Sequence, residues 1–593
     1  MTRLTAVRRL VVACLLAARC SSALAATDPQ ADFDALVAER WEYQLKESPE
    51  LATTIGDNRY NDRWTDYSLA HVVVDRDATA SFLHRFQAVD VSRLDEQRRL
   101  SQAMAVRELK DHLEAIRLKN HEMPLDQLGG VQLQLPGFVP TIPFDSTRHY
   151  EDYLARLKAI PGIVDQLIAA SRQGMADGLM QPRYLLEKVA VQARHIADPA
   201  GEANVFGQPV AHIPDSVPAK DRQRLKQAIL TAVDQQVRPA YRKLADFVAK
   251  DYAPRGRLQE GIWSLPDGDA RYRFAIHTQT TTDLDPKRIH QIGLDEVKRI
   301  EGEMTAIAHQ LGYASLPAFR TAMEKDRTRY ATSREQILNG YRQYIAGMQP
   351  ELPKLFGHLP TTALYVQAVE TYREKDAPGA EYHQGTPDGK RPGVVFVNTG
   401  DFAQRTLYTI EDTAYHEGVP GHHLQISIAQ NLPLPPFRQQ AGYNAYIEGW
   451  ALYAERLAKE VGFYKDPYND YGRLSGDLLR ADRLVLDTGV HALHWTRKQM
   501  IDFFHAHPAE DEPSMQAETD RYIAWPGQAL GYKLGQLKFL ELRQRAEKAL
   551  GTAFDIRAFH DEMLSGGAMP LDLLDARTDA WIANVKASTP THH

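Results

Sequence analysis

Apolar residues recur at every third or fourth position over long stretches of the chain, and this spacing predicts amphipathic helices. One such stripe consists of Leu225, Ile229, Val233, Val237, Tyr241, Leu244 and Val248. A second stripe, over residues 289–311, follows an N-cap candidate at Asp285 and ends before Gly312. Thr332 and Glu335 have the spacing of a capping box and predict the start of another helix.

Patterns typical of strands are few. Residues 394–397 form a β-branched run, and residues 272–277 and 365–372 are the other candidates. We therefore predict a mainly α fold with one small β-sheet. Residues 135–143 and 385–392 are rich in proline and glycine and are predicted to be long loops at the surface or lining a cleft.

No linker is evident within the body of the chain. We expect a helical half, residues 27–260, to pack against a catalytic half, residues 261–593, as parts of one continuous domain. Of the 593 residues, 43% are hydrophobic and 25% are charged, which is ordinary globular composition.

The first 26 residues have the pattern of a signal peptide. Three arginines precede an apolar run of roughly nine residues, well short of the ~20 that span a bilayer. An A-x-A pattern follows, so we predict export to the periplasm or beyond with cleavage after Ala25 or Ala26. A lipoprotein signal around Cys20 is the weaker alternative, because Arg19 stands where such signals have a small residue.

Removal of this segment changes the chemistry available to the mature chain. Both cysteines, Cys14 and Cys20, lie in the segment, which excludes disulfides and thiol catalysis. The mature chain would keep 66 basic residues against 77 acidic ones, and such a surface does not suit nucleic acid. We find no other apolar stretch long enough to cross a membrane, so we expect no membrane insertion after cleavage.

The segment from Thr413 to Gln425, T-A-Y-H-E-G-V-P-G-H-H-L-Q, carries the most informative pattern. In the H-E-x-x-H arrangement two histidines one helical turn apart bind zinc, and the glutamate between them is the general base. Here the fourth position after His416 is Pro420, and an ideal helix would place His422 about 9 Å further along the axis. Two ligand nitrogens on one zinc ion lie roughly 3.5 Å apart, so we predict a bulged helix with two residues looped out.

Two choices of metal ligand follow from these residues. His422 requires a smaller bulge than His423, so we favour His422 and expect His423 to orient the site or contact substrate. A later segment, Y-I-E-G-W-A-L-Y-A-E, places Glu448 and Glu455 near one face of a helix, and either can complete a set of two histidines and one glutamate. Glu417 would then activate the attacking water.

These strings resemble a bacterial family catalogued as domain of unknown function 885. The matching strings are H-E-G-V-P-G-H-H-L-Q at 416–425, E-G-W-A-L-Y-A-E at 448–455, R-P-G-V-V-F-V-N at 391–398, D-T-G-V-H at 487–491 and R-Y-I-A-W-P-G-Q-A-L-G-Y-K-L-G at 521–535. The motifs are also similar to those of the gluzincin zinc metallopeptidases. That similarity implies a large helical architecture with the sheet beside the metal-binding helix, Glu448 as the third ligand and Glu455 supporting it from behind.

The resemblance also implies roles for further residues. The strand ending at Asn398 would pair with the substrate backbone. His491 and Tyr532 are candidates for stabilising the transition state, with Asp487 orienting His491, and Arg521 is a candidate for binding a substrate carboxylate.

We therefore expect an exported peptidase with one Zn²⁺ per chain that hydrolyses short peptides in a deep cleft. Arg480, Arg483, Arg497 and Arg521 favour carboxypeptidase or dipeptidase action. Two alternatives are a zinc hydrolase of esters or non-peptide amides, and a non-catalytic periplasmic peptide-binding protein. Substrate side-chain preference and oligomeric state are left open.

Overall fold

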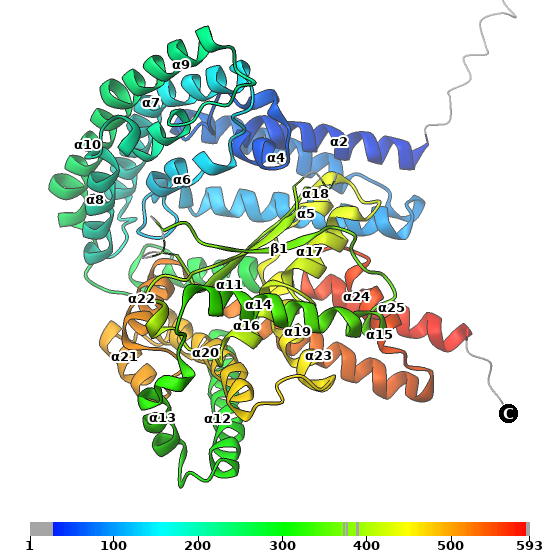
Figure 1. Ribbon diagram of the computed structural model, residues 1–593. Coiled ribbons are helices and arrows are strands. Elements are labelled where there is room, and N and C mark those ends of the chain that lie inside the picture. Colours follow the sequence, from blue (N-terminus) through cyan, green and yellow to red (C-terminus); the bar gives the residue numbers. More distant parts are fainter. Residues whose placement is uncertain (1–27, 372–373, 375–376, 387–388, 390, 589–593) are drawn as a thin grey trace, which may run out of the picture.

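A computed structural model describes residues 28–371, 374, 377–386, 389 and 391–588 (Figure 1). Helices dominate and a single three-stranded sheet lies among them, which confirms the predicted mainly α fold. The predicted signal peptide lies outside the described residues.

Residues 28–260 are mostly helical. Their α-helices are α2 (Pro29–Glu47), α3 (Pro49–Thr54), α4 (Leu69–Gln87), α5 (Glu96–Arg117), α6 (Val131–Gly137), α7 (Thr147–Asp177), α8 (Arg183–Ala197), α9 (Ala219–Ala232) and α10 (Arg238–Phe247). The predicted loop at 135–143 is wrong, because α6 and a 3₁₀ turn, Val139–Thr141, occupy most of it and bury their apolar side chains.

The apolar stripe from Leu225 to Val248 is confirmed, and all seven of its residues are buried. Successive residues of the stripe are mostly four positions apart, whereas an α-helix has 3.6 residues per turn. In a regular α-helix the stripe would therefore rotate gradually away from the core. Two π-helical turns, Val233–Val237 and Val248–Tyr252, flank α10 and widen the helix locally. The wider turns keep a four-residue repeat on one face.

The remaining helices surround the sheet and carry the histidine and glutamate motifs. They are α11 (Gly268–Thr280), α12 (Pro286–Gln310), α13 (Leu316–Lys325), α14 (Arg334–Met348), α15 (Leu352–Leu355), α16 (Ile410–Glu417), α17 (His422–Asn431), α18 (Pro436–Gln439), α19 (Asn444–Glu460), α20 (Pro467–Ala492), α21 (Arg497–Ala506), α22 (Glu512–Ala524), α23 (Leu530–Leu550), α24 (Ile556–Leu564) and α25 (Leu571–Ser588). The predicted helix after Asp285 is confirmed as α12, and Asp285 accepts a hydrogen bond from the backbone of Lys287.

Two local predictions are wrong. Residues 272–277 are helical, in α11, where Tyr272 and Ile276 lie one turn apart and are both buried. The cap of α14 is Ser333, whose hydroxyl accepts from the backbone of Gln336. In the first case buried residues at a helical spacing determined the structure, and in the second the adjacent serine caps the helix in place of Thr332.

The sheet has the strand order β1-β3-β2, with β1 at Leu364–Ala368, β2 at Ala380–His383 and β3 at Gly393–Val397. The run 394–397 is therefore confirmed as a strand. The candidate 365–372 overlaps β1, but the strand ends at Ala368. β3 is central, because β1 pairs with it in parallel and β2 pairs with it antiparallel on the other edge.

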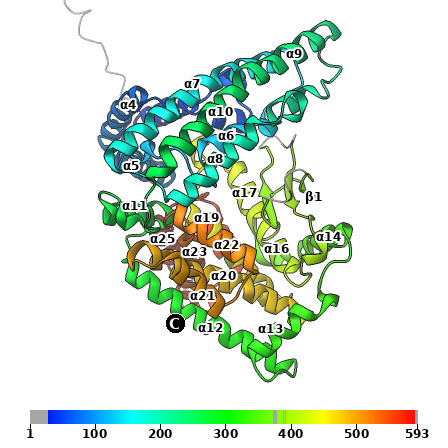
Figure 2. The same ribbon diagram turned by 90° about the vertical axis from the view of Figure 1, so that its left-hand side faces the viewer.

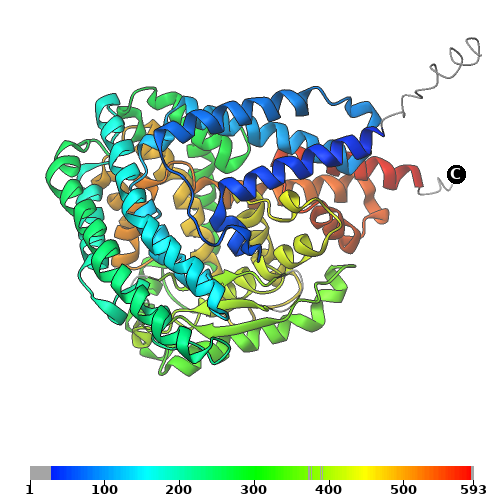
Figure 3. The same cartoon turned by 90° about the horizontal axis from the view of Figure 1, so that it is seen from above.

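The largest apolar core joins the two ends of the chain. Buried residues of α2, α4 and α5 pack in the same cluster as residues of α14, α19 and α23 to α25. Ion pairs also connect the two ends of the chain: Arg107 on α5 pairs with Asp572 on α25, and Glu96 pairs with Arg577. Figure 3 shows the blue N-terminal helices crossing beside the red C-terminal ones. The division near residue 260 stays a prediction, and this core crosses it.

A second core lies apart from the first. It is built from Trp64 and from residues of the range 125–253, which includes α7 to α10. Figures 1 and 2 place α7 and α9 at one end of the molecule and α12 and α13 at the opposite end. Across the described ranges, no helix combines the length and apolarity needed to cross a bilayer.

Candidate metal centre

The histidine motif breaks the helix into two pieces. α16 ends at Glu417 and α17 begins at His422, with a four-residue turn between them. The predicted bulge within a single helix is therefore wrong. The break nevertheless brings His416 and His422 together, as the bulge was expected to do. A Cβ atom at Gly421 would lie 2.0 Å from the carbonyl oxygen of His416, so only glycine fits where the chain doubles back.

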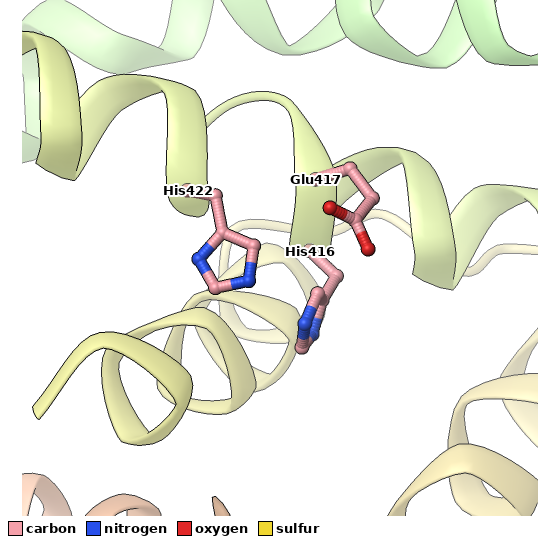
Figure 4. Close-up of side chains that lie close together, drawn as sticks. All are labelled: His416, Glu417 and His422. Atoms are coloured by element: carbon pink, nitrogen blue, oxygen red, sulfur yellow. The ribbon is translucent and has the colours of Figure 1, made fainter. Parts of the chain in front are cut away.

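The turn brings three ligand atoms together. Oε2 of Glu448, on α19, lies 3.5 Å from Nε2 of His416 and 3.5 Å from Nε2 of His422. The two imidazole rings are nearly perpendicular, with centroids 4.7 Å apart (Figure 4). Ligand atoms about 2 Å from one tetrahedral zinc ion lie about 3.3–3.5 Å from each other, so this separation fits a shared cation.

Unsatisfied polar atoms support the same interpretation. Oε2 of Glu448 is buried and accepts no hydrogen bond from any residue that the structure describes. A buried carboxylate oxygen without a partner is costly, by about 1–3 kcal/mol or more, unless another group compensates it. Two imidazole nitrogens and one carboxylate oxygen are a typical zinc donor set, so the residues fit Zn²⁺.

Glu455 and His423 contact the surroundings of this centre: Glu455 bonds one of the histidines, and His423 bonds the sheet. Oε1 of Glu455 is 2.6 Å from Nδ1 of His416, which fixes the ring with Nε2 facing Glu448. Nδ1 of His423 lies 3.1 Å from the hydroxyl of Tyr382 on β2, and burial lowers the pKa of His423 to about 4. His423 thus ties α17 to the sheet, whereas His422 faces Glu448.

Glu417 belongs to the same cluster. One ligand atom from each of His416, Glu417 and His422 lies within 4.8 Å of the others, so two carboxylates compete for the role of ligand. Glu448 fits the ligand role better, because its Oε2 is equidistant from both histidines and has no other partner among the described residues. Figure 4 shows the Glu417 carboxylate beside the histidine pair.

The charges of these side chains favour a cation at the centre. Burial lowers the pKa of His416, but Glu448 and Glu455 outweigh it and raise the pKa well above the usual value. Burial raises the pKa of Glu448, yet His416 and His422 bring it well below the usual range. Burial also raises the pKa of Glu417, against the opposing effect of the two histidines. The carboxylates of Glu448 and Glu455 therefore stabilise positive charge at His416, which a proton supplies when no metal is bound.

Neighbouring backbone holds the turn and the third ligand in place. The indole nitrogen of Trp450 donates to the carbonyl oxygen of Pro420 at 2.9 Å, so α19 fastens the turn directly. Gly449 on α19 meets Gly535 on α23, where a Cβ at Gly449 would lie 2.5 Å from the Gly535 backbone. Sequence reasoning missed Tyr382 and both of these contacts, because only long-range packing reveals them.

The predicted pairing of Asp487 with His491 is wrong. Nδ1 of His491 accepts from the backbone of Ile262 and Nε2 donates to the carbonyl oxygen of Tyr522. Both nitrogens are thus engaged with backbone, burial lowers the pKa of His491 to about 3, and no donor is free to stabilise a transition state. Asp487 instead accepts from the hydroxyl of Tyr272 and the backbone of Gly527.

The predicted substrate contact of Asn398 is also wrong. Its side-chain amide donates to the carbonyl oxygens of Glu374 and Ala377, and its side-chain oxygen accepts from the backbone of Gly400. Asn398 is 1% exposed. The strand before it cannot pair with a peptide either, because β1 and β2 occupy both edges of β3.

Tyr532 and Arg521 lie together in a group of charged residues on α20, α22 and α23. A guanidinium nitrogen of Arg521 donates to the hydroxyl of Tyr532 at 3.2 Å, and the guanidinium of Arg483 lies 4.4 Å from the centre of the Tyr532 ring. Tyr532 is 8% exposed. The catalytic role of Tyr532 and the carboxylate-binding role of Arg521 stay predictions.

Comparison with known proteins gives a family and two similar folds. A family model described as “Bacterial protein of unknown function (DUF885)” matches residues 49–577. The chain is 29% identical to a crystal structure described as “the putative lipoprotein from Colwellia psychrerythraea”, with a TM-score of 0.89 and coverage of 94% of this chain and 100% of that one. A structure from Shewanella oneidensis, described as “a putative lipoprotein of unknown function”, is 17% identical with a TM-score of 0.70, covers 93% of this chain and 99% of its own, and is similar in fold alone. No curated protein matches the chain by sequence.

Proposed function

The chain belongs to the DUF885 family of bacterial proteins of unknown function, and from its histidine centre we propose that it is an exported, zinc-dependent peptidase. The convergence of His416, His422 and Glu448 carries this proposal, because Oε2 of Glu448 lies 3.5 Å from Nε2 of each histidine, the separation expected of two ligands on one zinc ion. The centre would hold one Zn²⁺ per chain.

The proposed reaction is direct hydrolysis of an amide bond. When bound, Zn²⁺ supplies a Lewis acid that polarises the scissile carbonyl and lowers the pKa of a water molecule. Glu417 accepts the proton of that water and later donates it to the leaving amine. The raised pKa of Glu417 suits a group that must both take up and release a proton. Glu455 is bonded to Nδ1 of His416, so Nε2 is the nitrogen that would bind the metal.

We propose short peptides as substrates because the centre lies inside the protein. His416 is 4% exposed and His422 is 8% exposed, so a folded protein chain would not reach them without rearrangement. The deep cleft remains part of this proposal.

The proposed location is outside the cytoplasm. The signal-like pattern of the first 26 residues supports it, and the structures from Colwellia psychrerythraea and Shewanella oneidensis are each described as a “putative lipoprotein”. Mass spectrometry of the mature N-terminus distinguishes the two routes: a chain beginning after Ala25 or Ala26 indicates simple cleavage, and an acylated Cys20 indicates a lipoprotein. An unprocessed Met1 in the fractionated cell would contradict both.

Elemental analysis of the purified mature protein tests the metal centre. We expect one zinc per chain in the wild type and in His423→Ala, and loss of zinc in His416→Ala, His422→Ala and Glu448→Ala. His423 is the matched control, because it is adjacent to His422 in sequence but bonds Tyr382. Chelation should abolish hydrolysis of a peptide panel, and added zinc should restore it.

Two results would contradict the proposal. Absence of metal after zinc is supplied would exclude the zinc centre. Stoichiometric zinc without hydrolysis of any peptide in the panel would exclude the peptidase and retain only metal binding.

A further inference from the structure

Two arginines close together in sequence lie on α20, the helix that packs against α16 of the candidate metal centre. Arg480 and Arg483 lie three residues apart and therefore on one face of this helix, and Arg521 reaches the same group from α22. Arg480 lies beside α16, because a Cβ atom at Gly476 would be 3.1 Å from Nη1 of Arg480 and 2.8 Å from Oδ2 of Asp412 on that helix.

Arg480 makes no direct ion pair with a described residue, although two carboxylates are near it. Burial raises the pKa of Asp412 and of Glu510, and the charge of Arg480 opposes that rise. The one hydrogen bond of Arg480 within the described ranges goes from a terminal nitrogen to the carbonyl oxygen of Gly476. Nε of Arg480 is buried and donates to no described residue. A half-buried guanidinium with an unused donor is costly unless an anion binds it.

Arg483 and Arg521 share a single carboxylate. Both form ion pairs with Glu518, at 2.9 Å and 3.1 Å. Nη1 of Arg483 and Nε of Arg521 are buried and make no hydrogen bond to any residue the structure describes. Three guanidinium groups thus have one ion-paired carboxylate among them, and each keeps a donor without a partner.

The geometry points to a carboxylate-binding subsite: we propose that Arg480, Arg483 and Arg521 bind the free C-terminal carboxylate of a peptide substrate. The inference rests on the proposed peptidase function and specifies which bond is cleaved, namely one near the C-terminal end of the peptide. A guanidinium presents parallel N–H groups that match a carboxylate, which makes arginine the appropriate residue for this ligand. Tyr532 supports the subsite, because its ring lies against Arg483 and its hydroxyl accepts from Arg521.

Arg497, the fourth arginine that the sequence suggested, lies elsewhere. It pairs with Asp520 at 2.7 Å, and its guanidinium lies over the ring of Tyr184. Its charge is already compensated, so Arg497→Gln is a matched control for Arg480→Gln and Arg521→Gln.

Binding to an inactive protein tests the subsite without catalysis. The zinc-loaded mature Glu417→Gln protein is titrated by calorimetry with N-acetylated tri- and tetrapeptides of alanine and phenylalanine, each as the free acid and as the C-terminal amide. We expect the free acids to bind about 10- to 100-fold more tightly than the amides. Arg480→Gln and Arg521→Gln should each reduce this ratio by about tenfold, whereas Arg497→Gln should leave it unchanged. Arg480 forms no ion pair with the described residues, so its substitution tests the subsite even if Arg521→Gln does not fold.

The outcomes separate this inference from the peptidase proposal. Equal binding of acids and amides, no binding of either, or a preference that survives both substitutions would overturn the subsite. Wild-type protein that hydrolyses acids and amides at the same rate would likewise overturn it while leaving the peptidase intact. Acid-selective binding with no hydrolysis by the wild type would instead leave the subsite intact and exclude the peptidase.

Discussion

Glu417→Gln is expected to lower kcat for peptide hydrolysis by about 10²- to 10⁴-fold, the usual contribution of a general base. Glutamine keeps the size of the side chain but cannot accept a proton from water. Zinc content should stay at one per chain, because the ligand atoms belong to His416, His422 and Glu448. Steady-state kinetics and elemental analysis of the same preparation measure the two quantities together.

Glu512→Gln is the control for this change. Glu512 is exposed on α22 and pairs with His505, so the same loss of charge there should leave kcat unchanged. Two results would contradict the assigned role. One is a Glu417→Gln protein with wild-type kcat, and the other is a protein that loses its zinc, which would make Glu417 a ligand.

Gly421→Ala is expected to abolish zinc binding and to lower the free energy of unfolding by at least about 2 kcal/mol. The added Cβ would lie 2.0 Å from the carbonyl oxygen of His416 and 2.3 Å from that of Tyr415. Both contacts are with backbone, so a side-chain rotation cannot relieve them. The turn must open, and His422 must then move away from His416 and Glu448.

Gly442→Ala provides the comparison. Gly442 is exposed between α18 and α19, its φ is not positive, and nothing lies within 4 Å of an added Cβ. We expect zinc content and urea unfolding of Gly442→Ala to match the wild type. If Gly421→Ala also keeps one zinc per chain and wild-type stability, the close approach of the turn to His416 is not required for the site.

These two substitutions address different parts of the same centre. Glu417→Gln changes the chemistry and leaves the ligands in place, whereas Gly421→Ala leaves every ligand in the chain and changes their positions. Loss of activity with zinc retained in the first case, and loss of zinc in the second, would separate proton transfer from metal binding.

Much of the fold could be predicted from local patterns. The buried stripe of α9 and α10, the cap of α12 at Asp285 and the strand β3 follow from residues that are neighbours in sequence. Side-chain spacing and caps act over one or two turns, so their effect on structure is visible without the rest of the chain. The same reasoning failed for residues 272–277, where the buried pair Tyr272 and Ile276 follows a helical period.

The candidate site divides along a similar line. The His-Glu pair, the need to depart from a regular helix and the grouping with Glu448 could be read from spacing and residue type. The choice of His422 was an inference from bulge size, and the geometry that supports it comes from Tyr382, which engages His423 from a distant strand.

The sequence by itself determined the mainly helical fold, the position of the central strand and the set of residues able to hold zinc, because these depend on local periodicity and on side-chain chemistry. Tertiary structure alone decided which of these residues meet. It showed His491 and Asn398 bonded to backbone, paired Arg497 with Asp520, and brought Gly421 against His416. Such contacts join segments far apart in the chain or depend on the path of a turn, and no local pattern encodes them.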